Sequence, residues 1–414
     1  MTATDADRPS RSGREMLRGV RSLCGNEETT EMLKRILASA VLLAALLAVV
    51  GAAPAKLTGG NGTLYIGGWP NRIFIIDEAT EKITGTIDVT TAGPPKGGPP
   101  RSMVLSKNKK RFYLTNSLED VEILDIATRK SIDHFSMSEG RNKRTYIRGM
   151  VPDPLDRFLI MVLKVVEKKI DRYEVAPPKL VVYDLKEHKI ARTVPWPNNE
   201  ERENVNVMFS PDGKLLYFFA DEVLIYETTD FKQVDTWDLA RPIEEGYGRF
   251  DFGPRDTTYE EPGFYSGIFT VRDPVLNRDI MGVGRVNLTA KSFEWWPVGP
   301  AMQLSVGARP VGFSLAPDRK RAYGVLQEIG RYEFWTFDLE RHNVVKTEFD
   351  GRPRMALRPS TNGKLLYIYQ AGSTIDLYDA SNYKYLRTMT LDADETTDLI
   401  VVPADSARTP ATQP

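Results

Sequence analysis

Short hydrophobic strands recur in pairs along the chain, with a few turn residues between the members of each pair. The second strand usually ends in Asp, and Glu or Asn takes that place in the fourth and fifth pairs. The pairs are Leu64–Ile66 with Ile73–Asp77, Phe112–Leu114 with Val121–Asp125, Phe158–Leu163 with Leu180–Asp184, Leu216–Phe219 with Val223–Glu227, Gly267–Val271 with Gly282–Asn287, Ala322–Val325 with Phe334–Asp338, and Leu366–Tyr369 with Ile375–Asp379. Repeats of several short strands, about 40–60 residues apart, are typical of a propeller.

Two further strand types flank these pairs. One precedes the pair, most clearly at Ser102–Ser106, Val207–Asp212, Val311–Asp318 and Met355–Pro359, and several copies end in Pro and Asp ahead of a turn. Pro presets its own φ there and Asp folds back on the backbone, so these endings indicate tight turns. Another strand follows the pair, as in Lys82–Val89 and Tyr385–Leu391. Four strands in sequence predict one antiparallel blade per repeat.

The first repeat lacks its first strand, because only residues 56–63 precede its second one. A matching strand occurs at the other end of the chain, over Asp398–Asp405. We therefore predict an all-β fold: a seven-bladed β-propeller over residues 56–405, closed by a C-terminal strand that completes blade one. Closure removes the exposed sheet edges that favour aggregation. Residues 406–414, rich in Pro and Thr, are predicted to form a disordered tail.

The N-terminal region resembles an export signal. Met32–Arg35 is short and basic, Ile36–Ala53 is apolar, and Ala53–Ala55 offers a cleavage site with small residues. Residues 32–55 are therefore a signal peptide or, since the apolar stretch is long, an uncleaved membrane anchor. Residues 1–31 are either a disordered leader or lie upstream of a true start at Met32. We expect a periplasmic or otherwise exported protein that contacts a membrane only if the signal is uncleaved.

The charge and cysteine content exclude several functions. The chain carries 55 basic and 56 acidic side chains, so no global field attracts nucleic acid or an anionic membrane. The single cysteine, Cys24, precedes the signal. The exported part therefore has no disulfide, no thiolate metal site and no cysteine nucleophile.

Two connections are longer than the rest, and long loops on a rigid scaffold often carry recognition. Residues 165–178 separate the central strands of the third repeat, and residues 255–263 extend the first connection of the fifth. Within the former, the candidate docking residues for a partner or a cavity are Asp171, Arg172, Tyr173, Glu174, Pro177 and Pro178. The two prolines favour an extended backbone, which would make the loop project in a defined direction. The alternative is a long hairpin packed over its own blade.

No catalytic group emerges from the sequence. The three histidines, His134, His188 and His342, fall in turns or outer strands, far from one another. Asp77, Asp125, Asp184, Asp338 and Asp379 are expected to cap turns, and a channel-facing calcium ring is the alternative. The pair Trp295 and Trp296 could mark a partner surface, but strand alternation predicts that one ring is buried.

Part of the third repeat resembles a known family. The stretch Tyr173–Asp184 (Tyr-Glu-Val-Ala-Pro-Pro-Lys-Leu-Val-Val-Tyr-Asp) closely resembles the corresponding segment of the β subunit of quinohemoprotein amine dehydrogenase. The opening stretch Leu64–Asp77 and the closing repeat look like the same subunit. Elsewhere the similarity is shared with propellers in general, including the YVTN-repeat class and the heavy chain of methylamine dehydrogenase. The long connections and the 31-residue leader depart from the family pattern.

The resemblance implies an exported propeller subunit that has no catalytic residues and binds no cofactor itself. In that family, cysteine tryptophylquinone belongs to a small subunit and haem c to a dihaem cytochrome subunit, and the propeller docks both. This chain has no Cys-x-x-Cys-His motif for haem. Two other functions stay open: a stand-alone exported YVTN-type propeller that binds a protein or another ligand, and a propeller enzyme such as a lactonase. The sequence offers no channel-facing metal cluster for the latter.

Overall fold

The structure is a computed structural model that describes residues 32, 34–35, 56–93, 97–202, 206–220, 222–238, 250–255, 258–300, 312–328, 330–350, 355–369 and 372–404. The chain divides into two units, Met1–Lys56 and Leu57–Pro414. Most of the predicted signal at 32–55 and the whole predicted tail at 406–414 lie outside the described residues. Within the described part, no helical segment combines the length and hydropathy that a membrane span needs.

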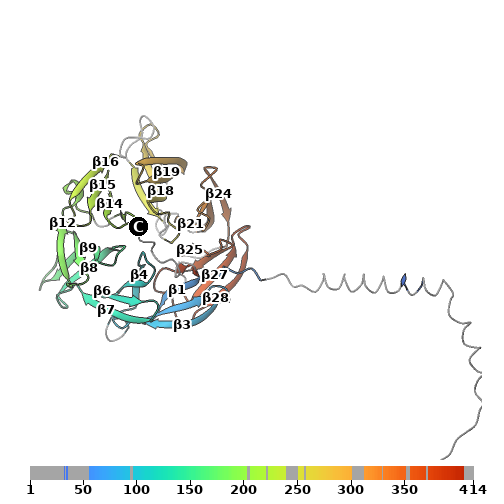
Figure 1. Ribbon diagram of the computed structural model, residues 1–414, viewed down its shortest axis with the longest axis horizontal. Helices are drawn as coiled ribbons and strands as arrows, with labels where there is room; N and C mark the ends of the chain where they lie inside the picture. The colour runs from blue at the N-terminus through green and yellow to red at the C-terminus, as the bar shows by residue number, and fades with distance from the viewer. Residues whose placement is uncertain are drawn as a thin grey trace, which may run out of the picture. The chain divides into compact units, whose positions relative to one another are not determined.

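The unit Leu57–Pro414 is built from antiparallel sheets (Figure 1). The described residues form seven sheets, each from consecutive strands except where β29 joins β1. The sheet of the first repeat consists of β29 (Ile400–Val402), β1 (Thr63–Gly68), β2 (Arg72–Asp77) and β3 (Lys82–Asp88), and that of the second of β4 (Pro100–Leu105), β5 (Arg111–Asn116), β6 (Asp120–Asp125) and β7 (Lys130–Ser136). The sheet of the third repeat consists of β8 (Lys143–Pro152), β9 (Phe158–Lys168), β10 (Tyr173–Val175), β11 (Lys179–Asp184) and β12 (Lys189–Val194). The sheet of the fourth consists of β13 (Asn206–Phe209), β14 (Leu215–Phe219), β15 (Val223–Glu227) and β16 (Gln233–Trp237).

The remaining sheets follow the same order. They consist of β17 (Phe250–Arg255), β18 (Phe264–Asp273), β19 (Arg278–Asn287) and β20 (Ser292–Pro300); β21 (Ser314–Leu315), β22 (Arg321–Glu328), β23 (Arg331–Asp338) and β24 (Asn343–Glu348); and β25 (Ala356–Pro359), β26 (Leu365–Tyr369), β27 (Thr374–Asp379) and β28 (Tyr385–Thr390). A 3-10 turn, η1 (Pro197–Asn199), follows β12. Figure 1 shows the sheets side by side around a common centre, which is the arrangement of a β-propeller.

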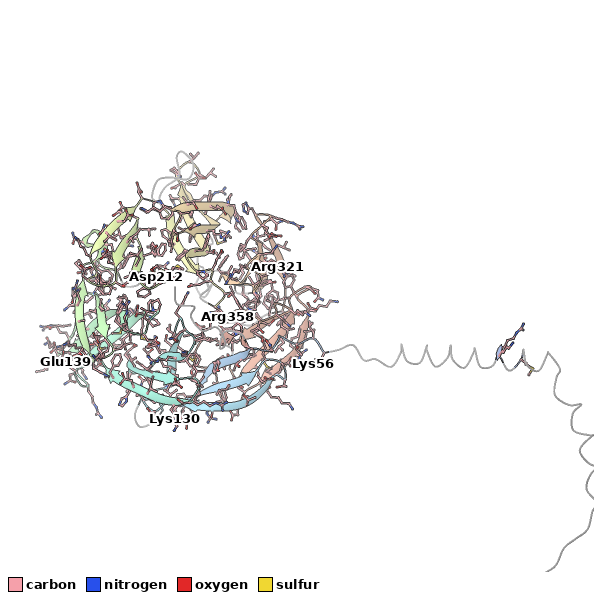
Figure 2. The ribbon with its side chains drawn as sticks, in the orientation of Figure 1. Lys56, Lys130, Glu139, Asp212, Arg321 and Arg358 are labelled. Atoms are coloured by element: carbon pink, nitrogen blue, oxygen red, sulfur yellow. The ribbon has the colours of Figure 1, made fainter. Side chains whose placement is uncertain are left out.

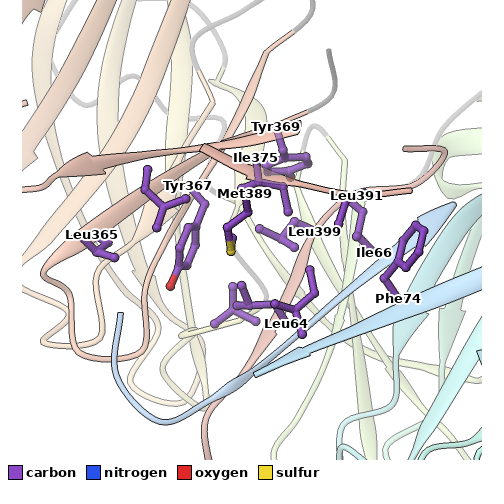
Figure 3. Close-up of a cluster of buried hydrophobic side chains, with 13 residues drawn as sticks. Leu64, Ile66, Phe74, Leu365, Tyr367, Tyr369, Ile375, Met389, Leu391 and Leu399 are labelled. Atoms are coloured by element: carbon purple, nitrogen blue, oxygen red, sulfur yellow. The ribbon is translucent and has the colours of Figure 1, made fainter. Parts of the chain in front are cut away.

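Apolar side chains of adjacent sheets form the core. Strands β2 and β6, the third strands of the first two repeats, are almost entirely buried, whereas the fourth strands β3 and β7 are mostly exposed or half-buried. One buried cluster joins the first and last repeats, with Leu64 and Phe74 packed beside Tyr367, Leu377 and Leu399 (Figure 3). The hydrophobic pattern of the paired strands therefore reflects burial on both faces, since each sheet is covered by two neighbours.

Strand β29 pairs with β1 in the sheet of the first repeat. Residues Ile400–Val402 lie antiparallel to β1, with Val401 opposite Leu64. Nearby, the fully buried carboxylate of Glu78 accepts hydrogen bonds from Gly62 N at 2.8 Å, Thr361 N at 2.9 Å and the Tyr367 hydroxyl at 2.9 Å. Glu78 thus joins two ends of the chain that are about 280 residues apart in sequence.

The predicted turn-capping role of the strand-end aspartates is confirmed. Asp77 accepts from Thr80 N at 2.7 Å, Asp125 from Thr128 N at 2.7 Å and Asp338 from Arg341 N at 2.8 Å. Asp184 and Asp379 make equivalent bonds to Glu187 N and Ser381 N. Hydrogen bonds from the Thr80 hydroxyl and N–H lower the pKa of Asp77 below its usual range, and those from the Thr128 N–H and hydroxyl do the same for Asp125.

Candidate functional site

The long connection of the third repeat is a β-hairpin rather than an irregular loop. Strand β9 has 11 residues, compared with six in β2 or β5, and its extra length pairs with β8 on one side and β10 on the other. At a rise of about 3.3 Å per residue, five additional residues lengthen the strand by roughly 16 Å. The part of the connection that we expected to be a loop therefore continues the sheet, because Val165 and Val166 extend the apolar run of β9.

Charged side chains of the hairpin pair with one another. Lys169 Nζ lies 2.6 Å from Glu167 Oε1 and 3.5 Å from Glu174 Oε2, and Arg172 Nη2 lies 2.7 Å from Glu174 Oε1. The hydrogen bond from Lys169 lowers the pKa of Glu167, and the same bond raises the pKa of Lys169. The ion pairs of Glu174 with Lys169 and Arg172 therefore lie within the hairpin.

Large apolar side chains of the hairpin face solvent. Tyr173 is 66% exposed, Val175 is 55% exposed and Ile170 is fully exposed. Single exposed apolar residues are common, but three within six positions at the end of a rigid element are typical of a docking surface. The candidate residues Asp171, Arg172, Tyr173 and Glu174 therefore lie together on the projecting part of the hairpin.

The two prolines have different positions. Pro177 is exposed, whereas Pro178 is buried at the base, where its carbonyl accepts a hydrogen bond from Trp196 Nε1 at 3.0 Å. This bond joins the return of the hairpin to the segment that follows β12. Pro178 consequently fixes the base of the hairpin, and the exposed contact residues lie ahead of it.

A groove follows the face of the hairpin that is directed toward the second repeat. Its volume is about 590 Å³, with Leu163, Val165 and Val181 among the apolar lining residues and Glu139 and Lys179 among the charged ones. Glu139 lies at the outer side of the ring in Figure 2. Leu163 and Val181 are buried at the base of the groove, and Val165 is half-buried where β9 continues beyond them.

The long connection of the fifth repeat is directed inward. Tyr259 is only 8% exposed and packs with Ile268, Leu315 and Trp296, and Arg319 Nε donates to its carbonyl at 3.0 Å. Glu260 pairs with Lys107, a turn residue of the second repeat. We expected this connection to carry recognition, but Tyr259 packs against strand residues of a core cluster and Glu260 pairs with a turn of another repeat.

A second exposed hairpin end was not singled out from the sequence. Strands β18 and β19 have 10 residues each, and the turn between them exposes Val275 (86%) and Leu276 (55%). Asp273 orders this turn by accepting hydrogen bonds from the backbone N–H groups of Val275 and Leu276. The signal that could have identified it is the apolar pair Val275 and Leu276 within the turn sequence Asp273–Asn277.

The groups considered for catalysis remain dispersed. His134, His188 and His342 are exposed, and the described residues contain no group of three or more His, Cys, Asp or Glu side chains that could hold a metal ion. His342 stacks on Trp296 with ring centroids 5.7 Å apart. Trp296 is buried, and Trp295 is half-buried within another core cluster, so the tryptophan pair contributes mainly to packing.

The chain was compared with family models, curated proteins and solved structures. No family model and no curated protein matches the chain. One similar solved structure is dihydro-heme d1 dehydrogenase NirN in complex with DHE, with 11% sequence identity and a TM-score of 0.44 over 83% of this chain and 76% of that one. Another is apo AztD from Citrobacter koseri, with 14% sequence identity and a TM-score of 0.47 over 84% of this chain and 98% of that one. A third is the β-propeller domain of Myceliophteria thermophila Cps50 (Swd1), with 11% sequence identity and a TM-score of 0.42 over 74% of this chain and 89% of that one. Nothing about a ligand or reaction of this chain follows from these similarities.

Proposed function

We propose that this chain is a non-catalytic propeller subunit of an exported, amine-dehydrogenase-like redox complex, and that the third-repeat hairpin docks a partner protein. The seven sheets would be seven blades of one ring, completed by the pairing of β29 with β1. Haem c and cysteine tryptophylquinone would belong to a dihaem cytochrome subunit and a small quinone-bearing subunit. The propeller would hold these subunits and supply no reacting group.

The observation that carries the docking role is the hairpin itself. A rigid, paired strand presents Tyr173 at 66% exposure beside Val175 and Ile170. An ordered aromatic anchor loses little conformational entropy when it is buried by a partner, which favours affinity. The resemblance of Tyr173–Asp184 to the amine dehydrogenase subunit supports the choice of complex.

Affinity capture of the full-length protein from its native host tests this function. A capture under mild conditions is followed by a visible spectrum of the eluate and by quinone staining of small polypeptides. Haem c bands together with a quinone-staining band are the expected result. A colourless propeller that elutes alone would contradict the redox complex and favour a stand-alone YVTN-type binding module.

The double variant Tyr173→Ala with Glu174→Ala tests the hairpin. We expect capture of the redox subunits to weaken at least about tenfold, because truncation of an interface anchor costs this much or more. Tyr385→Ala is the matched control, since Tyr385 is 56% exposed on β28, in a different repeat. If the double variant and Tyr385→Ala lost capture of the redox subunits equally, or if the double variant lost none, docking through the hairpin would be contradicted.

A further inference from the structure

The outer edge of β10 has backbone groups directed away from the sheet. Arg172 O accepts from Lys169 N at 2.8 Å and Ala176 N donates to Val165 O at 2.9 Å, so the even-numbered residues are bonded toward β9. In an antiparallel strand, the alternate residues then direct their N–H and C=O groups to the other side. Tyr173 and Val175 are those residues. Among the described strands, β10 pairs with β9 alone.

The reason for this edge is a difference in strand length. Strand β12 covers the outer edge of β11 and ends at Val194, opposite Leu180. Strand β10 lies beyond that point, past Pro177 and Pro178. Native proteins usually protect such edges with prolines or charged side chains. Here the prolines end the edge at its base, while the side chains of Tyr173 and Val175 lie on one face of the hairpin beside the open edge.

The two faces of the hairpin differ in chemistry. The register places Tyr173 with Lys168 and Val175 with Val166 on one face. The opposite face carries Glu167 and Glu174, and both of these carboxylates are already paired with Lys169. The first face is thus apolar and basic, and it complements a strand with apolar and acidic side chains.

We propose that the outer edge of β10 binds an extended segment of a partner protein by strand addition. The segment pairs with the N–H and C=O groups of Tyr173 and Val175, and its apolar and acidic side chains face Tyr173, Val175 and Lys168. Main-chain hydrogen bonds supply affinity in this mode, and alternate side chains supply specificity. This inference rests on the proposed docking function and specifies the chemistry of the partner.

The test uses a synthetic probe and a pair of variants at one position. The probe is a labelled octapeptide in which Glu alternates with Val or Phe, and a scrambled peptide of the same composition is its control. Val175→Pro removes one outward N–H without removing a bond to β9, whereas Val175→Ala keeps that N–H and shortens the side chain. We expect fluorescence anisotropy to show binding that weakens at least about tenfold in Val175→Pro and only about threefold in Val175→Ala.

Hydrogen exchange of the unmodified protein provides a measurement that does not depend on a variant. The probe is expected to slow exchange of the Tyr173 and Val175 amides, with the scrambled peptide leaving them unchanged. Equal binding of both peptides, unchanged exchange at these amides, or equal affinity of Val175→Pro and the unmodified protein would overturn strand addition.

Failure of this inference is distinguishable from failure of the docking function. If Tyr173→Ala with Glu174→Ala abolishes capture of the redox subunits while Val175→Pro leaves capture intact, docking stands and strand addition is wrong. If neither variant changes capture, the docking function itself is wrong.

Discussion

The long connections of the third and fifth repeats contain the same dipeptide in opposite environments. Tyr173 is 66% exposed and Tyr259 is 8% exposed. The side chain of Glu174 is 45% exposed and pairs within its own hairpin, whereas that of Glu260 is 11% exposed and pairs with Lys107 in another repeat. A Tyr-Glu pair in a long connection therefore does not by itself indicate recognition. Its role depends on whether other parts of the fold lie close enough to cover it.

The difference follows from where each connection leaves its sheet. The connection of the third repeat joins the second and third strands, and that of the fifth joins the first and second. Because the repeats share one strand order, these connections leave opposite ends of the sheets. At the end where the fifth-repeat connection lies, turns such as the one containing Arg319 approach it. The third-repeat connection instead continues as paired strand into solvent.

The largest expected effect is the loss of Tyr259. Tyr259→Ala removes a buried aromatic ring from a core cluster between two sheets, and we expect it to lower the free energy of unfolding by about 3–5 kcal/mol. Urea denaturation followed by tryptophan fluorescence would measure the change. A loss below about 1 kcal/mol would show that this connection is no more structural than the hairpin.

A buried carboxylate gives the next largest effect and a pH dependence. Glu122 is fully buried, which would raise its pKa, but hydrogen bonds from Thr90 and Thr91 outweigh burial and lower the pKa below its usual value. For an acid with a lowered pKa in the folded state, the stabilisation is present above the unfolded value of about 4.3 and is lost as the pH falls through the folded value. The exposed Glu167 has a lowered pKa too, but solvent screening limits its contribution.

Glu122→Gln checks that reasoning. It should cost about 1–3 kcal/mol at pH 7, because the amide cannot accept hydrogen bonds with both of its terminal atoms. The difference from the unmodified protein should begin to shrink as the pH falls below about 4.3, where the unfolded state binds the proton, and should be smallest below the lowered pKa of the folded state. Glu167→Gln, in the hairpin, is the control, because solvent screening limits the contribution of Glu167 to the free energy of unfolding. Denaturation midpoints from pH 3 to pH 7 would measure both, and a constant difference for Glu122→Gln would contradict the assignment.

Arg319→Met tests the hydrogen bond that holds the fifth-repeat connection. Arg319 Nε donates to the Tyr259 carbonyl at 3.0 Å, and its loss should cost about 1 kcal/mol. Arg172→Met is the matched variant in the hairpin, where the lost partners are exposed carboxylates and the cost should stay below about 0.5 kcal/mol. Similar costs for the two variants would remove the contrast between the two connections.

Tyr173→Ala should have the smallest effect on stability. Because the ring is mostly exposed, we expect the free energy of unfolding to change by no more than about 0.5 kcal/mol. Its effect should appear instead in partner capture. A destabilisation comparable to that of Tyr259→Ala would show that the hairpin packs against its own sheet, which is the structural alternative to docking.

Much of the fold was predictable from the sequence. Strands such as Ile73–Asp77 and Val121–Asp125 show apolar and β-branched runs that end in a turn-capping Asp, and these signals are local. The C-terminal strand was predictable because the first repeat lacks its first strand. The hairpin was only partly predictable: the prolines mark its return, but the continuation of β9 to Lys168 depends on pairing with both β8 and β10.

By itself, the sequence determined the strands, their order and the turn chemistry, since these follow from the alternation of side chains and from the conformations of Pro, Asp and Gly. Which connection is buried follows from contacts between distant parts of the chain. Tyr173 and Tyr259 both precede Glu in a long connection, and the burial of Tyr259 and Glu260 depends on residues such as Lys107 and Leu315 that are far away in the chain. Folding brings those residues beside Tyr259 and Glu260, while the continued pairing of β9 carries Tyr173 away from the sheets.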